Sequence, residues 1–272
     1  MAIELVDAQG NPVFDAASDA GIGAGIGAGI AGRRTRRSTW RLLALLLLMT
    51  AVLRLPAYFV EVFNSDETFL ATQAEVINEG GHLYQDAADR KPPLVPYLYA
   101  SVFALVGSTA LWSVRVVALL AVVATAMLLA IEARRRYGER AAWLAAILFV
   151  LASVAFAPQD GQAANFEVFM LPAMTAAMVF ANRGRAGSSG VAIAFATLAK
   201  QTGAATLLPV LYLVAKHRGR RGVAATLAGF ALPIAVVAVL VGPGDLLFWG
   251  VLGNGSYFGL GSVSAYVVGV FA

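Results

Sequence analysis

Long apolar runs alternate with short clusters of arginine and lysine along most of this 272-residue chain. Basic clusters between apolar runs are typical of the cytoplasmic loops of membrane proteins. The composition agrees, because 59% of the residues are hydrophobic and only 13% are charged, whereas about 25% charge is usual in soluble domains. The pattern excludes an ordinary soluble enzyme, a disulfide-rich secreted scaffold and a disordered protein. It predicts an all-α, polytopic membrane protein.

The apolar runs predict a helical bundle with about seven transmembrane helices. Five of these spans follow directly from the runs: 40–58, 110–132, 141–156, 166–181 and 223–241. The run 191–215 is long enough for one helix, but one helix would place the basic cluster 216–221 outside, against the charge rule. We therefore expect two short helices that meet at a polar outer turn over Lys200–Gly203.

The first 39 residues are expected to form a flexible cytoplasmic tail, and residues 40–272 a single transmembrane module. The glycine-rich run 21–30 lacks the preceding strand and the Gly-Lys-Ser/Thr of a phosphate loop. Arginines at the start of the first span predict a cytoplasmic N-terminus, with the protein in the plasma (inner) membrane. The apolar stretch 261–272 is too short to cross, so we expect a truncated chain or the N-terminal module of a larger protein.

The segment 60–108 is expected to be an outer loop, because it holds seven acids and only two bases. Its apolar run Leu94–Val106 spans about 20 Å as a helix, short of the roughly 30 Å of hydrocarbon. We expect this run to lie in the outer interface. The aromatic residues expected to line the membrane boundary are Tyr84, Tyr97, Tyr99 and Trp112.

Charged residues near the outer boundary are the candidate functional residues, since charge close to a bilayer is costly and usually functional. Each of them can face one cavity at the outer leaflet. The set consists of Arg54, Asp66, Glu67, Lys91, Arg115, Asp160, Glu167 and Lys200.

These residue types suit the transfer of a sugar from a polyprenyl phosphate to an acceptor hydroxyl. The reaction needs a base near the incoming oxygen, for which Asp66 or Glu67 is a candidate. It also needs cations for the departing phosphate, a role for Lys91 with support from Arg54, Arg115 or Lys200. Asp66, Glu67 and Asp160 could hold a divalent ion such as Mg²⁺ or Mn²⁺ through oxygen ligands, although the sequence demands no cofactor.

Several motifs resemble polyprenyl-phosphate-dependent glycosyltransferases of the C-type membrane fold (GT-C), the group of protein O-mannosyltransferases and aminoarabinose transferases of lipid A. The resemblance covers about residues 40–240. It is carried by Ser65–Glu67, Gly81–Asp86, Asp89–Leu94, Phe103–Gly107, Ser113–Val116, and Leu198–Lys200 with Pro209.

The resemblance implies a GT-C bundle with a first-loop acid as catalytic centre, which carries onto Asp66 with Glu67 beside it. It implies a lysine on the donor phosphate, which carries onto Lys91. A second-loop acid is implied as well, for which Asp160 is the nearest match and Glu167 a rival, because the residues around Asp160 depart from the family pattern. The resemblance also implies further C-terminal helices and an outer domain, which we expect to be absent from residues 1–272.

The leading hypothesis is therefore an inverting glycosyltransferase at the outer face, acting on a lipid, glycan or protein acceptor, with no nucleic-acid partner. One alternative is a transporter or lipid flippase that binds an anionic substrate at Lys200 and the broken helices. Another is a non-catalytic module that binds the lipid donor. Flux without sugar transfer would favour the first alternative, and donor binding without turnover the second.

Overall fold

The computed structural model describes residues 36–60, 62, 64–155 and 158–253, and these residues are helical with no β-strand. The chain divides into two units, residues 1–45 and 46–272. A helix over residues 36–53 includes most of the first predicted span and is followed by the 3₁₀ turn η1 (Leu55–Tyr58). The predicted tail up to residue 35, with its glycine-rich run, and the stretch 261–272 lie outside the described residues.

The helices that follow confirm the predicted apolar runs as helical elements. They are α4 (Trp112–Tyr137), α5 (Glu139–Ala155), α7 (Phe166–Asn182), α8 (Ala186–Ala199) and α9 (Leu207–Val241). Among the described residues, two segments are long and apolar enough to cross a membrane, namely α4 and Gln201–Val241. The shorter helices α3 (Leu94–Val106), α7 and α8 are also apolar.

The predicted break at Lys200 is confirmed. Helix α8 ends at Ala199, Lys200 is extended, and the 3₁₀ turn η2 (Gln201–Thr206) leads into α9. Gly219 then divides α9 into two arms, because its φ of 59° and ψ of −155° are not helical. A positive φ of this kind favours glycine, which lacks a Cβ. The basic cluster 216–221 therefore lies at a turn between helical arms.

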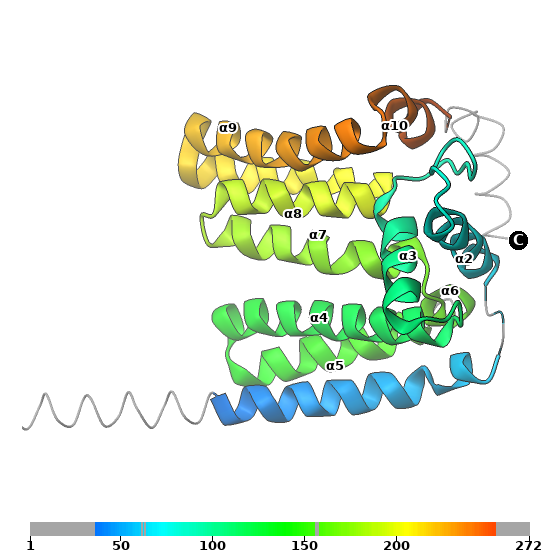
Figure 1. The fold of residues 1–272 in the computed structure, drawn as a ribbon. Coiled ribbons are helices and arrows are strands. Elements are labelled where there is room, and N and C mark those ends of the chain that lie inside the picture. Colours follow the sequence, from blue (N-terminus) through cyan, green and yellow to red (C-terminus); the bar gives the residue numbers. More distant parts are fainter. Residues whose placement is uncertain (1–35, 61, 63, 156–157, 254–272) are drawn as a thin grey trace, which may run out of the picture. The chain divides into compact units, whose positions relative to one another are not determined.

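Helix packing in the second unit depends on small side chains. Helix α4 packs against α5 and α7, α7 packs against α8, and α8 packs against α9 (Figure 1). A Cβ at Gly190 of α8 would overlap the backbone carbonyl of Thr226 in the second arm of α9. Ala177, Ala192 and Val214 are buried in the core that α7, α8 and α9 share. Close approach of these helices therefore requires glycine and alanine at the contact.

Shorter elements gather at one end of the long helices. They are α2 (Ser65–Asn78), α3, α6 (Pro158–Gln162) and α10 (Pro243–Gly250). Figure 1 shows α3 running across the ends of the long helices, and it contacts α2, α4 and α8. The predicted bounds of α3 agree with the structure. The residues of α2 were expected as part of the outer loop 60–108, without helix bounds of their own, and α2 forms because Leu70 and Ala74 bury one side of it.

Candidate functional site

The first-loop acids stand at the start of α2, where Asn64 caps the helix. The Asn64 side-chain oxygen accepts a hydrogen bond from the backbone N–H of Asp66 at 2.8 Å. Carboxylates in the first turn of a helix are favoured by the helix dipole. Successive helical residues point about 100° apart, so Asp66 and Glu67 face different surroundings. The two adjacent acids therefore differ in role.

Asp66 faces the open side of the site and pairs with Lys91. The Lys91 Nζ donates to Oδ2 of Asp66 at 3.0 Å, and the side chain of Asp66 is 41% exposed. The same ammonium lies 4.1 Å from the ring centroid of Phe166, at the start of α7. A cation over an aromatic face is attracted by the ring quadrupole. Asp66 and Lys91, predicted as catalytic and donor-binding residues, are thus brought together.

Glu67 faces the protein interior and forms a buried pair with Arg115 of α4. Nε and Nη2 of Arg115 donate to the two carboxylate oxygens at 3.0 and 2.6 Å. Oε1 of Glu67 also accepts from the backbone N–H of Ala164 at 2.7 Å. Nη1 of Arg115 donates to the carbonyls of Ala57 and Val60. The pair ties α2 and α4 to η1, to Val60 after it and to Ala164 before α7.

The backbone around Lys91 is held by two side chains. The Tyr84 hydroxyl donates to the Lys91 carbonyl at 2.7 Å, and Gln201 Nε2 donates to the Arg90 carbonyl at 3.2 Å. Tyr84 has a positive φ of 77° and is buried, with its ring stacked on Trp249 of α10. Burial raises the pKa of its hydroxyl. Tyr84 and the fully buried Tyr99 are therefore core residues, which corrects their expected place in a boundary belt.

Lys200 and Glu167 form a second ion pair, between the turn after α8 and the first turn of α7. Glu167 follows Phe166 directly, and Phe166 carries the ammonium of Lys91 on its ring. The two ion pairs, Asp66–Lys91 and Glu167–Lys200, therefore meet at the start of α7.

Asp160, the predicted second-loop acid, lies close to the first loop. Its Oδ1 accepts from Nδ2 of Asn64 at 2.8 Å, and its backbone carbonyl accepts from Nδ2 of Asn165 at 3.0 Å. Asn64 thus links Asp160 to the backbone of Asp66. Asn165 in turn caps α7 through Val168. Neither asparagine was among the predicted site residues, although each directly precedes an apolar or acidic helix start, which is an N-cap signal.

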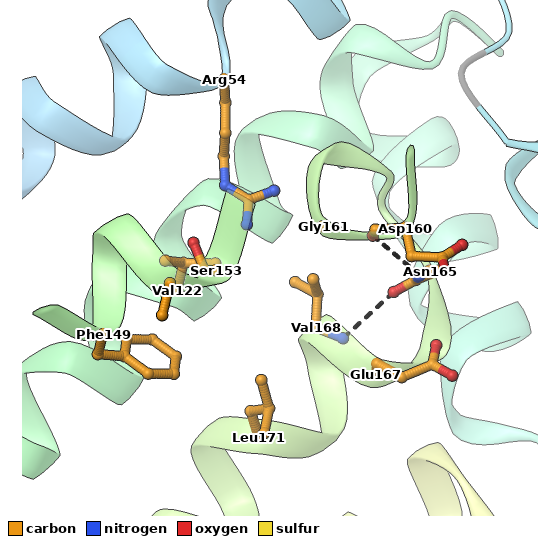
Figure 2. Close-up of a pocket in the computed structure, with 11 residues that line it drawn as sticks. Arg54, Val122, Phe149, Ser153, Asp160, Gly161, Asn165, Glu167, Val168 and Leu171 are labelled. Atoms are coloured by element: carbon orange, nitrogen blue, oxygen red, sulfur yellow. Dashed lines mark hydrogen bonds between the residues drawn. The ribbon is translucent and has the colours of Figure 1, made fainter. Parts of the chain in front are cut away.

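Arg54 occupies a separate cavity of about 370 Å³. The side chain is only 3% exposed, and within the described residues none of its three guanidinium nitrogens has a hydrogen-bond partner. Figure 2 shows the guanidinium pointing into a space bounded by α4, α5 and the start of α7. Asp160, Asn165 and Glu167 supply the polar wall, and Val122, Phe149 and Leu171 supply apolar wall. Neither Lys91 nor Asp66 lines this cavity.

The three predicted metal ligands already have other partners. Asp66 pairs with Lys91, Glu67 with Arg115, and Asp160 with the amide of Asn64. In the described ranges no group of three or more His, Asp or Glu side chains converges in a way that could hold a metal ion. These carboxylates therefore serve as acceptors for side chains of the protein.

Apolar helices with a cluster of carboxylates and cations at one end define a membrane-associated protein with a polar site. Residues 90–243 match the family model described as dolichyl-phosphate-mannose-protein mannosyltransferase. The match covers more than half of the chain, which therefore belongs to this family of glycosyltransferases. No curated protein and no solved structure matches the chain. The match includes Lys91, Arg115, Asp160, Glu167 and Lys200, whereas Arg54, Asp66 and Glu67 precede it.

Proposed function

We propose that the protein transfers a sugar from a polyprenyl phosphate to an acceptor hydroxyl at the outer face of the membrane, with inversion at the anomeric carbon. The observation that carries this proposal is the 3.0 Å pair between Asp66 and Lys91. In this pair a partly exposed carboxylate lies beside an ammonium. The carboxylate suits deprotonation of the acceptor hydroxyl, and the ammonium suits stabilisation of the departing phosphate. The family match supports a glycosyltransferase.

In the proposed reaction Asp66 is the general base. As the acceptor oxygen attacks the anomeric carbon, its proton passes to the carboxylate of Asp66. The new C–O bond forms on the face opposite the leaving group. The bond between the anomeric carbon and the phosphate oxygen breaks, and its electron pair leaves with the lipid phosphate. Direct displacement of this kind inverts the anomeric configuration.

Lys91 is the proposed cation for the departing phosphate. A fixed cation stabilises the negative charge that develops as the glycosidic bond breaks. Lys200 is half-buried next to Glu167 and can support it across the start of α7. An apolar groove of about 410 Å³ begins at Pro93, two residues from Lys91, and is lined by Leu94 and Tyr97 opposite Leu198, Val237 and Leu240. Its chemistry suits the isoprenoid chain of the donor.

Glu67 and Arg115, two of the predicted site residues, are positioning residues in this scheme. Their pair is buried and uses both carboxylate oxygens of Glu67. Because Glu67 directly follows Asp66, the pair fixes the first turn of α2 and therefore the direction of the Asp66 side chain.

We further propose a multi-pass topology of about seven spans with the site outside. Basic residues end α4 at Arg134–Arg136 and occupy the Gly219 turn. Figure 1 places both of these opposite the end where α2, α3 and α6 gather. The positive-inside rule then puts the basic end in the cytoplasm and the acidic loop outside.

The test is sugar transfer by the purified full chain in lipid nanodiscs, with a labelled polyprenyl-phosphate sugar. Asp66→Asn should lower the rate at least about 100-fold, as expected for loss of a general base. Glu75→Gln is the matched control, since Glu75 is an exposed acid on the same helix. Unchanged turnover in Asp66→Asn would refute the proposed base. Donor binding with no transfer by the unsubstituted chain would favour a non-catalytic module.

A further inference from the structure

The buried guanidinium of Arg54 has no use in the proposed donor site. Its residue is 3% exposed, and Nε, Nη1 and Nη2 lack partners within the described residues. A buried charge is costly unless an opposite charge or hydrogen-bond acceptors satisfy it. The cavity that Arg54 lines therefore presents these three donors and a positive charge to an anionic or strongly accepting group.

The carboxylates of the cavity do not supply that group. Asp160 accepts from the amide of Asn64, and Glu167 pairs with Lys200. Neither carboxylate forms an ion pair with Arg54 in the structure, although both line the same cavity. The guanidinium presents a planar fork of donors that matches a phosphate or carboxylate group.

The rest of the cavity suits an apolar chain. Val122 of α4, Phe149 of α5 and Leu171 of α7 line it away from the acids (Figure 2). Val122 and Leu171 belong to apolar helices that we assign to the bilayer. An occupant that satisfies both walls carries an anionic group and a hydrocarbon segment, as an acidic lipid does.

We propose that the Arg54 cavity binds a second anionic lipid, distinct from the donor, and that this lipid is the acceptor. The inference rests on the proposed glycosyl transfer. The donor has its own cation at Lys91 and its own groove between α3, α8 and α9. The two sites adjoin at the start of α7, where Lys91 contacts Phe166 while Asn165 and Glu167 line the cavity. An acceptor headgroup anchored there lies next to Asp160, which Asn64 links to Asp66.

The probe is phosphatidylglycerol, measured by its retention on the full chain in phosphatidylcholine nanodiscs. Arg54→Gln should weaken retention about tenfold or more, as expected for loss of a desolvated charge-assisted contact. Leu171→Trp should weaken it as well, because the indole fills the apolar part of the cavity without touching the charge. Arg220→Gln is the matched control, since Arg220 is an exposed arginine in the Gly219 turn.

Two further measurements use inorganic phosphate as a competitor and the donor lipid as a second ligand. If inorganic phosphate displaces phosphatidylglycerol at equal concentration, the site recognises a free anion and the proposal of a lipid fails. If Arg54→Gln weakens polyprenyl-phosphate binding as much as phosphatidylglycerol binding, the cavity belongs to the donor and the inference is overturned. Equal retention by Leu171→Trp and the unsubstituted chain also overturns it. Lipid retention that depends on Arg54, without any donor turnover, would overturn the proposed transferase reaction and with it the acceptor role, while the anionic-lipid site at Arg54 would stand.

Discussion

Nη2 of Arg115 lies 2.6 Å from Oε2 of Glu67, although the two residues are 48 positions apart in the chain. The side chains are 5% and 0% exposed, so the pair is almost fully desolvated. Such a pair gives little net stability compared with an apolar replacement, but removing one partner leaves the other charge buried and unpaired. The ion pair therefore fixes the position of the first turn of α2 relative to α4 more than it adds to stability.

The first prediction concerns this pair. Arg115→Met should lower the free energy of unfolding by about 3–5 kcal/mol, because Glu67 would remain buried without its partner. The double variant Glu67→Gln with Arg115→Met should lose clearly less. The measurement is denaturant unfolding of the full chain in detergent. Arg134→Met is the control, since Arg134 pairs with Glu139 near the surface, where such a pair contributes at most about 1 kcal/mol. Equal losses for the two single variants would contradict the prediction.

The second prediction separates the charge of Lys91 from its shape. Lys91→Gln should lower the rate of sugar transfer about 100-fold or more, since a cation no longer faces the departing phosphate. Lys91→Arg keeps the charge and should recover part of that rate. The readouts are kcat and the KM for the polyprenyl-phosphate sugar. A change confined to stability, with normal kinetics at saturating donor, would show that Lys91 serves only the ion pair with Asp66.

Asn64 carries the third prediction, because it caps α2 and also holds Asp160. Asn64→Ala should cost about 1 kcal/mol of stability through the lost cap and should slow transfer. Asn64→Ser keeps an oxygen that can cap α2, but it lacks the amide group that donates to Asp160. We expect it to restore stability while transfer stays slow. If both properties recover in Asn64→Ser, the link between Asn64 and Asp160 has no role in the reaction.

The helices were predictable because their signal is local. Apolar runs fixed α3, α4, α5 and α7 to within a few residues, and the charge rule predicted the break at Lys200 that the structure confirms. The bounds of α2 were not predicted, because its acids resemble those of a solvated loop. Its burial depends on contact with α3, which no local pattern in the sequence shows.

The partners of the charged residues were not predictable. Asp66 and Glu67 are neighbours with the same chemistry, and only the point where α2 begins decides which one faces the interior. Arg54 and Arg115 are both buried, but Arg115 forms an ion pair with Glu67, whereas Arg54 lines a cavity. That difference depends on which helices become neighbours. The set of candidate residues was therefore predictable from the sequence. Which of them form buried ion pairs and which of them line a cavity was not.

The fourth prediction concerns divalent ions. Sugar transfer should change less than about twofold when EDTA is added, because the three carboxylates suited to Mg²⁺ or Mn²⁺ accept from Lys91, Arg115 and Asn64; hard cations of this kind require oxygen ligands. The assay compares initial rates before and after chelation, with added Mg²⁺ as the reversal. Loss of activity that Mg²⁺ or Mn²⁺ restores would show that at least one of these pairs opens to bind a metal ion.

The last prediction uses Asp89, which lies in the first loop two residues before Lys91. Burial raises the pKa of its carboxyl, and the nearby ammonium of Lys91 opposes this only in part. Its Oδ2 is buried and has no hydrogen-bond partner within the described ranges. Because the native pKa is raised above the unfolded value of about 3.9, neutral Asp89 favours the folded loop. That contribution is complete below the unfolded pKa and is lost as pH rises through the native pKa.

At neutral pH the charged Asp89 therefore destabilises the first loop, and Asp89→Asn should relieve this. We expect amide hydrogen exchange over residues 84–91, corrected for intrinsic rates, to show higher protection in Asp89→Asn at pH 7 than in the unsubstituted chain. The difference should shrink as pH falls toward 4. Asp86→Asn is the comparison, since Asp86 lies in the same loop with an exposed side chain. Protection that is equal in Asp89→Asn and the unsubstituted chain at pH 7 would mean that water or a ligand group already satisfies the carboxylate.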